Sequence, residues 1–270
     1  MNDSNPLVVA TQCYYWKPMA ALFRALELRV YRESGVKVRG PVLDLGCGDG
    51  QVISMLKKLG VVQDQVGGLE ISAKEIAKAY ENKIHKWLLQ GSANDLPFKD
   101  ESFSSIISNG VLCSIPEGVG DALREVHRVL KKEGTFVVTV PTDKFSDVLL
   151  VPKVLRKFSV RWSSWYIRKL NARLPHYNLY SAQEWERHFE KAGFSVIPKK
   201  QFFSEQAGNL WSLFAMHMVR PCGFLKFVRI QSVENCMSRF LQFVCGNSYS
   251  HDKDNSTANY GYLFLVGMKK

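Results

Sequence analysis

Three glycines in five positions follow a short apolar run in the segment GPVLDLGCGDGQVISML, residues 40 to 56. A strand that ends in a glycine-rich turn and opens a helix presents backbone N–H groups and the positive helix end to a ligand. A triphosphate loop requires GxxxxGK[ST], and no Lys-Ser or Lys-Thr pair follows Gly50. A dinucleotide fingerprint requires GxGxxG, whereas Gly46, Gly48 and Gly50 give GxGxG after Asp44. The spacing therefore argues against both of these ligands.

Short apolar runs alternate with helical patterns between residues 41 and 140. Continuous apolar strands that are each followed by a helix indicate a parallel sheet covered on both faces. We therefore predict an α/β fold with a doubly wound core over residues 36–142. Helical periodicity predicts an additional helix over residues 19–34, and the segment 120–134 is also predicted to be helical.

The pattern changes after residue 143, although we expect residues 1–270 to form a single domain. Residues 144–178 mix apolar, aromatic and basic side chains at helical spacing, which predicts an inserted helical cap. Ser181 and Glu184 form a capping-box pattern at the start of a helix that ends at Gly193. A second, irregular insert spans about 202–258, and the apolar run after it predicts a last strand. Residues 143–270 are thus expected to form the substrate-side half.

The charge distribution is uneven along the chain. Of the formal net charge of +11, residues 143–270 hold 19 Lys and Arg against 9 Asp and Glu. A basic surface favours an anionic partner such as nucleic acid, a lipid headgroup or a phosphorylated substrate, and a solvated basic face explains the same numbers. The six cysteines form no CxxC pair, so we expect reduced thiols and no metal site. No Lys or Arg precedes the first apolar run and no apolar stretch approaches membrane-spanning length, which predicts a cytoplasmic protein.

The pattern from Asp44 to Gly50 resembles the cofactor-binding signature of class I S-adenosylmethionine-dependent methyltransferases. The resemblance recurs in GGLEIS, in GSANDLPFKDESFSSIISNGVL and in ALREVHRVLKKEGTFVVTVP, in the order expected for the family. Within this family, the chain is similar to the methyltransferases that act on small molecules, a group that includes those of ubiquinone and menaquinone biosynthesis. The resemblance implies a seven-stranded Rossmann-like methyltransferase sheet and S-adenosyl-L-methionine as the cofactor.

The resemblance also implies roles for individual residues. Asp44, Gly46, Gly48 and Gly50 would lie beside the methionine part of the cofactor, Glu70 would hold the ribose, Leu69 and Ile71 would flank the adenine, Ala93 and Asn94 would meet its edge, and Asn109 would lie near the transferred methyl group. The chain departs from the family at Ser92, where many relatives have Asp, so no carboxylate is present to accept from the adenine amine. It departs again at Cys113-Ser114-Ile115, where the family often has Glu-His-Ile.

The core motifs leave the methyl acceptor open. His176 in LPHYNLYS is the candidate catalytic base, although a purely structural histidine fits the same pattern. Helices rich in aromatic and basic residues, with Trp162 and Trp165 among them, suit a lid over an apolar acceptor or a peripheral contact with an anionic membrane. The leading hypothesis is methyl transfer to a small acceptor, such as a lipidic or isoprenoid-like molecule. An RNA methyltransferase and a non-catalytic cofactor-binding regulatory protein are the alternatives, and nucleic acid is disfavoured because no RNA-binding module is recognised.

Overall fold

A computed structural model describes residues 5–215, 231–251 and 259–270 of the chain. The contacts within it divide the chain into two compact units. The first, which we call the sheet unit, comprises Gly35–Asp143, Pro175–Lys200 and Leu263–Lys270. The second, the helical unit, comprises Met1–Ser34, Lys144–Leu174 and Gln201–Tyr262. The start of the sheet unit and its break at Asp143 lie within a residue of the predicted core boundaries.

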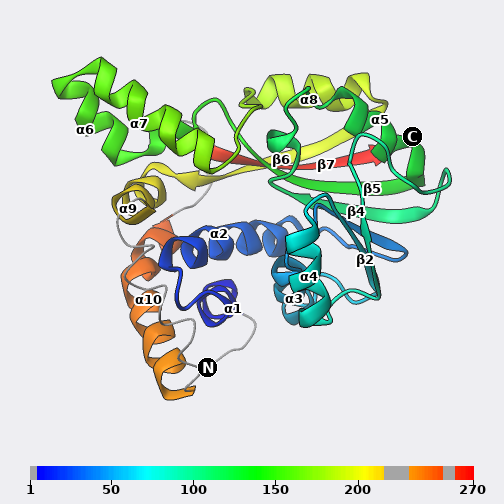
Figure 1. The fold of residues 1–270 in the computed structure, drawn as a ribbon, viewed down its shortest axis with the longest axis horizontal. Helices are drawn as coiled ribbons and strands as arrows, with labels where there is room; N and C mark the ends of the chain where they lie inside the picture. The colour runs from blue at the N-terminus through cyan, green and yellow to red at the C-terminus, as the bar shows by residue number, and fades with distance from the viewer. Residues whose placement is uncertain (1–4, 216–230, 252–258) are drawn as a thin grey trace. The chain divides into compact units, whose positions relative to one another are not determined.

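A seven-stranded sheet with the order β3-β2-β1-β4-β5-β7-β6 is the central feature of the fold (Figure 1). The strands are β1 (Val42–Leu45), β2 (Val66–Glu70), β3 (Trp87–Gln90), β4 (Phe103–Asn109), β5 (Leu130–Pro141), β6 (Phe194–Ser204) and β7 (Tyr260–Lys269). Strands β1 to β5 pair in parallel, with Asp44 opposite both Gly68 of β2 and Ile107 of β4. The predicted Rossmann-like α/β sheet is confirmed.

Helices cover both faces of the sheet, as a doubly wound fold requires. Helices α3 (Gln51–Lys58) and α4 (Ala73–Asn82) lie on one face, and α5 (Gly120–Val129) and α8 (Ala182–Lys191) lie on the other (Figure 1). The predicted capping box is present at α8, where the Ser181 side chain accepts from the Glu184 N–H and the Glu184 carboxylate accepts from the Ser181 N–H.

One helix boundary differs from the prediction. Helix α5 ends at Val129, whereas the sequence pattern predicted a helix as far as Gly134. Leu130 is extended, fully buried and paired with Phe103 of β4, so strand pairing begins directly after the helix. The polar residues between Leu130 and Gly134 belong to the start of β5 because tertiary pairing overrides their helical propensity.

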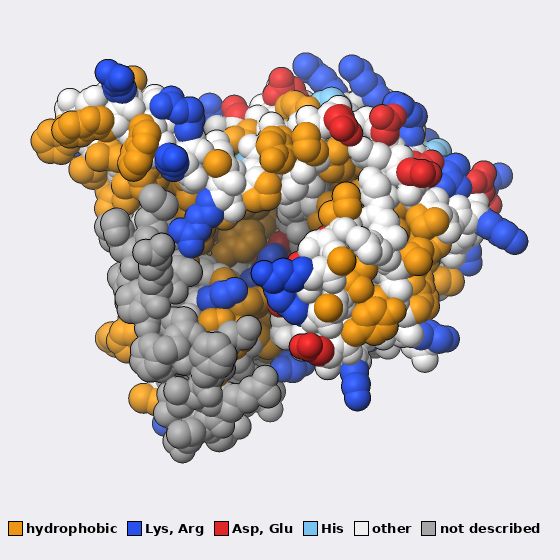
Figure 2. All heavy atoms as spheres, in the orientation of Figure 1, with side chains coloured by type: hydrophobic (Ala, Val, Ile, Leu, Met, Phe, Trp, Pro, Cys, Tyr) orange, Lys and Arg blue, Asp and Glu red, His pale blue; other side chains and the backbone are white. Residues whose placement is uncertain are grey.

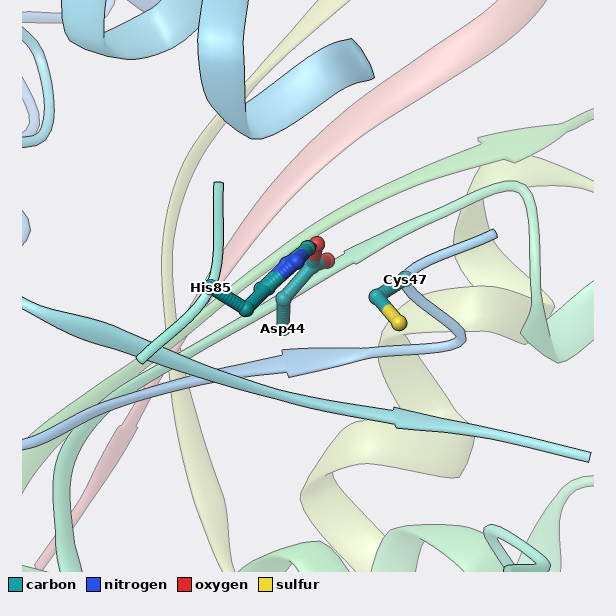
Figure 3. Close-up of side chains that lie close together, drawn as sticks. All are labelled: Asp44, Cys47 and His85. Carbon is teal, nitrogen blue, oxygen red and sulfur yellow. The ribbon is translucent and has the colours of Figure 1, made fainter. Parts of the chain in front are cut away.

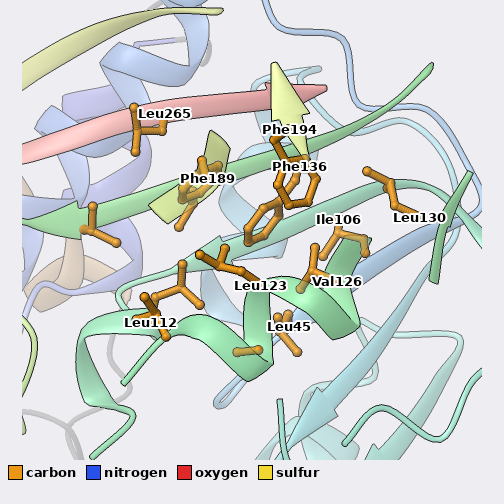
Figure 4. Close-up of a cluster of buried hydrophobic side chains, with 14 of the residues drawn as sticks. Leu45, Ile106, Leu112, Leu123, Val126, Leu130, Phe136, Phe189, Phe194 and Leu265 are labelled. Atoms are coloured by element: carbon orange, nitrogen blue, oxygen red, sulfur yellow. The ribbon is translucent and has the colours of Figure 1, made fainter. Parts of the chain in front are cut away.

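The hydrophobic core of the sheet unit lies between the sheet and helices α5 and α8 (Figure 4). Phe136 of β5 stacks on Phe189 of α8 with ring centroids 5.5 Å apart. Trp185 of α8 is fully buried, and its indole N–H donates to the carbonyl oxygen of Pro141 at 3.1 Å. These contacts fix the sheet against α8, so the carboxyl ends of the strands are held in a rigid frame.

The helical unit contains most of the two predicted inserts. Its helices are α1 (Pro6–Cys13), α2 (Pro18–Ser34), α6 (Leu150–Phe158), α7 (Val160–Arg173), α9 (Glu205–Ala215) and α10 (Gln231–His251), and a 3-10 turn spans Phe145–Val148. Phe23 of α2 packs on Phe203 and Tyr262, with ring centroids 5.7 and 4.6 Å away. Thr11 of α1 shares a 2.9 Å hydrogen bond with Ser238 of α10. The helical unit therefore has a packed core of its own, to which segments far apart in the sequence contribute.

The second insert holds more regular structure than the sequence suggested. Helix α10 buries Ser238, Leu241 and Cys245, which share one helical face. Because two of these three buried side chains, Ser238 and Cys245, are small, the periodicity of the face did not stand out in the sequence. Residues 216–230 and 252–258 of the predicted insert lie outside the described residues. Among the helices that the structure describes, none is both long enough and apolar enough to cross a membrane.

Candidate cofactor site

A cavity of about 480 Å³ opens at the carboxyl ends of the parallel strands in the sheet unit. Strand β1 lies between β2 and β4, so the chain connections diverge there and leave a crevice, the usual ligand position in such sheets. The volume lies within the range of about 300–1,000 Å³ that is typical of small-molecule sites. The cavity is lined by Leu45, Gly46, Leu69, Glu70, Ile71, Gly91, Ser92, Ala93, Asn94, Asn109, Gly110, Val111, Ser114, Ile115, Pro116 and Glu117.

The lining contains seven residues that the sequence assigned to the site. They are Gly46, Leu69, Glu70, Ile71, Ala93, Asn94 and Asn109. The other three predicted cofactor residues, Asp44, Gly48 and Gly50, stand behind or beside the lining rather than in it. The loop from Val111 to Glu117 contributes lining residues that no motif had indicated as binding residues.

The glycine loop is fastened to the neighbouring strand. The backbone N–H groups of Gly46 and Cys47 both donate to the carbonyl oxygen of Leu69, at 2.7 and 3.1 Å. Gly46 has a φ of +70°, and a Cβ added there would lie 2.2 Å from Cγ2 of Val111. Glycine is thus required at position 46 both by the backbone conformation and by close packing against the loop after β4.

Glu70, at the end of β2, holds both the glycine loop and the residue that precedes α4. Its Oε2 accepts from the Gly48 N–H at 3.0 Å, and its Oε1 accepts from the Ser72 N–H at 2.9 Å. The side chain also lines the cavity. A carboxylate offers about four acceptor positions, so these two bonds leave capacity for the two ribose hydroxyls. The structure adds to the predicted ribose role a second task, which is to hold the glycine loop.

Asp44 lies below the glycine loop and is paired with a residue that the sequence analysis did not single out. His85 Nε2 lies 3.0 Å from Asp44 Oδ2, and both side chains are buried (Figure 3). A Cβ added at Gly50 would lie 2.9 Å from the His85 ring, and one added at Gly68 would lie 3.0 Å from it. His85 therefore supports the loop from beneath. Asp44 and His85 are 41 residues apart in sequence, so no local sequence pattern predicts that they pair.

A possible metal site must also be considered at this place. One ligand-type atom from each of Asp44, Cys47 and His85 lies within 4.8 Å of the others. In Figure 3 the His85 ring lies against the Asp44 carboxylate, while the Cys47 sulfur points away from both. Burial, together with the negative charges of Asp44 and Glu70, raises the pKa of the Cys47 thiol far above its usual value. The hydrogen bond between His85 and Asp44 already pairs two of the three groups. We interpret the cluster as a hydrogen-bonded support for the loop.

The part of the cavity wall at Ser92 and Asn94, where the adenine is predicted to lie, offers a free acceptor in place of the missing carboxylate. Ser92 Oγ accepts from the Asn94 N–H at 3.2 Å, so this hydroxyl shapes the turn. Asn94 Oδ1 is buried and has no hydrogen-bond partner within the described ranges. A buried acceptor in a cavity wall fits a ligand that donates, as an exocyclic amine does. The residues present therefore fit an adenine ring at this position.

The far side of the cavity is formed by the end of β4. Asn109 stands opposite Thr139 of β5, and the Thr139 hydroxyl donates to Asn109 Oδ1 at 3.3 Å. This bond orients the Asn109 amide in the cavity wall. Gly110 follows with a φ of +71°, and its N–H donates to the Thr139 carbonyl oxygen at 2.9 Å. The strand end is thus rigid where the reacting methyl group is predicted to lie.

The charge of the cavity wall distinguishes among ligands. Two ionisable side chains, those of Glu70 and Glu117, occur among the described lining residues. Both are carboxyl groups, which attract a cation and repel a pyrophosphate or triphosphate. S-adenosylmethionine carries a sulfonium and an ammonium group. The electrostatics therefore agree with the glycine spacing in disfavouring NAD and nucleoside triphosphates.

His176 lies in the segment that returns from the helical unit. The first insert's helices end at Arg173, and the N–H groups of Tyr177 and Asn178 then donate to the carbonyl oxygen of Cys113 at 2.8 and 3.0 Å. His176 is not among the residues that line the cavity, and burial lowers its pKa to about 4. General bases work best with a pKa near the operating pH. The catalytic role remains a prediction that this geometry does not favour.

A pH experiment separates the structural and catalytic roles of His176. Its folded pKa of about 4 lies below the value of about 6.5 in an unfolded chain, so the unfolded state binds more protons between those values. The free energy of unfolding should therefore fall as the pH drops from about 6.5 toward 4. We expect His176→Asn to flatten this part of the urea-midpoint profile and to keep turnover close to the wild-type rate. A loss of turnover of about a hundredfold or more, with stability unchanged, would make His176 the base.

Comparisons with known proteins agree with this geometry. The family described as "Methyltransferase domain" matches residues 43–138. A demethylmenaquinone methyltransferase of Lactiplantibacillus plantarum is 32% identical over 183 residues, which cover 60% of this chain and 73% of that enzyme. An uncharacterized protein of Methanocaldococcus jannaschii is 42% identical over 102 residues, and the chain spans 36% of its length.

A solved structure from Thermotoga maritima shows the same fold. It is described as a SAM-dependent methyltransferase, possible histamine N-methyltransferase, and has a TM-score of 0.54 at 18% identity. The match covers 90% of this chain and 87% of that one. The sheet order, the cavity at the strand ends, the acidic residue at the end of β2 and the relative of which this chain covers 73% lead to one assignment. The chain belongs to the class I S-adenosylmethionine-dependent methyltransferases.

Proposed function

We propose that this methyltransferase acts on a small apolar acceptor of the quinol type. The observation that carries the proposal is the likeness to the demethylmenaquinone methyltransferase, at 32% identity over most of that enzyme. The loop after β4 is compatible with such an acceptor, because Val111, Ile115 and Pro116 give this part of the cavity wall an apolar surface. We further propose that the reaction takes place in the cytoplasm.

The cavity residues divide the task of methyl transfer between them. When bound, S-adenosylmethionine supplies an electrophilic methyl group on a positively charged sulfur. Glu70 would hold the ribose, Asn94 would accept from the adenine amine, and the backbone of Gly46 would face the methionine part. The acceptor would form its new bond to the methyl carbon as the sulfur–methyl bond breaks, so that the sulfur keeps the electron pair as a neutral thioether and the acceptor gives up one proton.

Alignment and exclusion of water are the main contributions that the chain itself can make. Well-oriented reactants gain up to about 7–11 kcal/mol of the barrier from orientation alone. Asn109, held by Thr139, and the glycine loop, held by Leu69, are rigid parts of the wall. Cys47 and Cys113 are unsuited to covalent catalysis, because burial raises the pKa of the Cys113 thiol to about 11 and raises that of Cys47 further. We therefore propose direct transfer to the acceptor.

A substrate comparison tests the proposal. The full chain is incubated with methyl-labelled S-adenosylmethionine and either a chemically reduced demethylmenaquinone with a short isoprenoid tail or total RNA. We expect label in the quinol fraction, one methyl mass added per acceptor, and no label in RNA beyond a heat-inactivated control. Label in RNA alone would establish the alternative of an RNA methyltransferase. Cofactor binding with no label in either fraction would instead support a regulatory protein.

A further inference from the structure

Helices α6 and α7 form a tight hairpin within the helical unit. Ser159 alone connects them, closing α6 and capping α7, where its side chain accepts from the Trp162 N–H at 3.4 Å. The Ser163 hydroxyl donates to the Pro152 carbonyl oxygen at 2.9 Å and joins the two helices. Ser163, Tyr166 and Leu170 are buried on one face of α7. The hairpin is therefore a defined structure with an inner and an outer face.

The outer face and the tip of the hairpin are strongly apolar. Phe158 and Val160, on either side of the connecting serine, are 77% and 68% exposed. Trp162 and Trp165 follow one turn apart on α7 and are 59% and 51% exposed. Val154 of α6 is also exposed. Figure 2 shows hydrophobic side chains gathered over α6 and α7, which Figure 1 labels. Apolar side chains gathered in this way mark a surface that contacts something other than water.

The charged side chains of the hairpin itself all have one sign. Between Leu150 and Arg173 the sequence contains seven Lys and Arg residues and no Asp or Glu. Six of them are exposed, namely Arg156, Lys157, Arg161, Arg168, Lys169 and Arg173. The seventh, Lys153, pairs with Glu205 of α9. The free charges therefore stand beside the exposed aromatic side chains on the same two helices.

We propose that the α6–α7 hairpin docks on the surface of an anionic phospholipid bilayer. Tryptophan and phenylalanine favour the boundary between headgroups and acyl chains, and Lys and Arg beside them meet anionic headgroups. A second copy of the chain would present the same positive charges and be repelled. An RNA partner would use the basic groups but leave the tip residues Phe158 and Val160 in water. The inference goes beyond the proposed reaction and does not depend on the identity of the acceptor.

Vesicle co-sedimentation of the full chain tests the docking surface. We expect binding to vesicles of phosphatidylcholine with about a quarter phosphatidylglycerol, and much weaker binding to phosphatidylcholine alone. Trp162→Ala/Trp165→Ala should weaken the partition coefficient at least about tenfold, since two aromatic anchors are removed. Arg156→Gln/Lys157→Gln should weaken binding to the anionic vesicles by about fivefold for each charge at low salt.

Matched controls locate the contact. Phe240→Ala/Phe243→Ala removes an exposed aromatic pair with the same spacing on α10, and Lys74→Gln/Lys99→Gln removes two exposed charges from the sheet unit. Both control variants should bind vesicles like the wild type. A loss in the Phe240/Phe243 variant with none in the tryptophan variant would overturn the assignment to the hairpin. Absence of vesicle binding by the wild type would also overturn it, without touching the methyltransferase proposal.

A fluorescence experiment tests the same contact without relying on the alanine variant, which could misfold. Brominated phosphatidylglycerol quenches tryptophans that enter the bilayer boundary, so we expect vesicles to quench part of the wild-type fluorescence. Trp162→Phe/Trp165→Phe keeps aromatic anchors and should keep most of the vesicle binding while losing the quenched component. Quenching that persists in this variant would place the membrane contact at other tryptophans and contradict the proposal.

Discussion

Replacing Glu70 by alanine is expected to weaken the binding of S-adenosylhomocysteine by at least about tenfold, and by up to about a hundredfold. The side chain lines the cavity and also accepts from the backbone of Gly48 and of Ser72. Its loss removes the predicted ribose partner and loosens the loop at once. Hydrogen bonds to a charged group contribute about 1.5–3 kcal/mol each, which supports a large effect. Isothermal titration calorimetry of the folded variant measures the change.

A matched carboxylate provides the control for Glu70. Glu117 lines the same cavity, and no hydrogen bond from a loop N–H to its carboxylate is among the contacts of the described residues. Glu117→Ala removes the same charge and should bind S-adenosylhomocysteine nearly as well as the wild type. Equal losses in the two variants would mean that net charge, rather than a specific ribose contact, controls affinity. Unchanged affinity in Glu70→Ala would contradict the assigned role.

Gly46→Ala should be the most destabilising single-methyl change in the glycine loop. The new Cβ would lie 2.2 Å from Val111 Cγ2, and the φ of +70° disfavours any residue with a side chain. Backbone strain of about 1–2 kcal/mol and overpacking of about 1–3 kcal/mol together predict a fall of about 2–5 kcal/mol in the free energy of unfolding. This corresponds to a melting temperature lower by roughly 5–15 °C.

Two further variants test the reason for the Gly46 effect. Gly48 has a φ of +53°, but a Cβ added there meets no protein atom within 4 Å, so Gly48→Ala should lose only the strain component. Val111→Ala should restore part of the stability of Gly46→Ala by removing the overlapping methyl groups. The free energies of unfolding of the two single variants and the double variant, measured by thermal unfolding, form a double-mutant cycle. If Val111→Ala gives no rescue, the steric account of Gly46 is wrong.

The sheet and the cofactor loop were predictable from the sequence because their signals are local. Continuous apolar runs mark β1 to β5, and the glycine spacing after Asp44 sets the loop apart from other phosphate-binding turns. Helix α5 ends before the predicted residue, because Leu130 pairs with Phe103 of β4 and so belongs to a strand. Helix α10 was missed because its buried face combines Ser238 and Cys245 with Leu241.

The support of the site was not predictable from the sequence in the same way. His85 reaches Asp44 from the connection before β3, and its contacts with Gly50 and Gly68 exist only after the sheet has formed. Ser92 brings no charge to the predicted adenine site, and the nearby Asn94 holds a buried acceptor in the same wall that the sequence did not indicate. In both cases the chemistry depends on where a side chain points, which neither periodicity nor motif spacing specifies.

A crystal structure of the full chain with S-adenosylhomocysteine tests the central claim most directly. The account predicts that the ligand lies in the cavity at the ends of β1, β2 and β4, with both ribose hydroxyls donating to Glu70. The adenine amine should lie within hydrogen-bond distance of Asn94 Oδ1, and the sulfur should face Asn109. Ligand density elsewhere in the molecule, or a ribose that does not touch Glu70, would contradict the account.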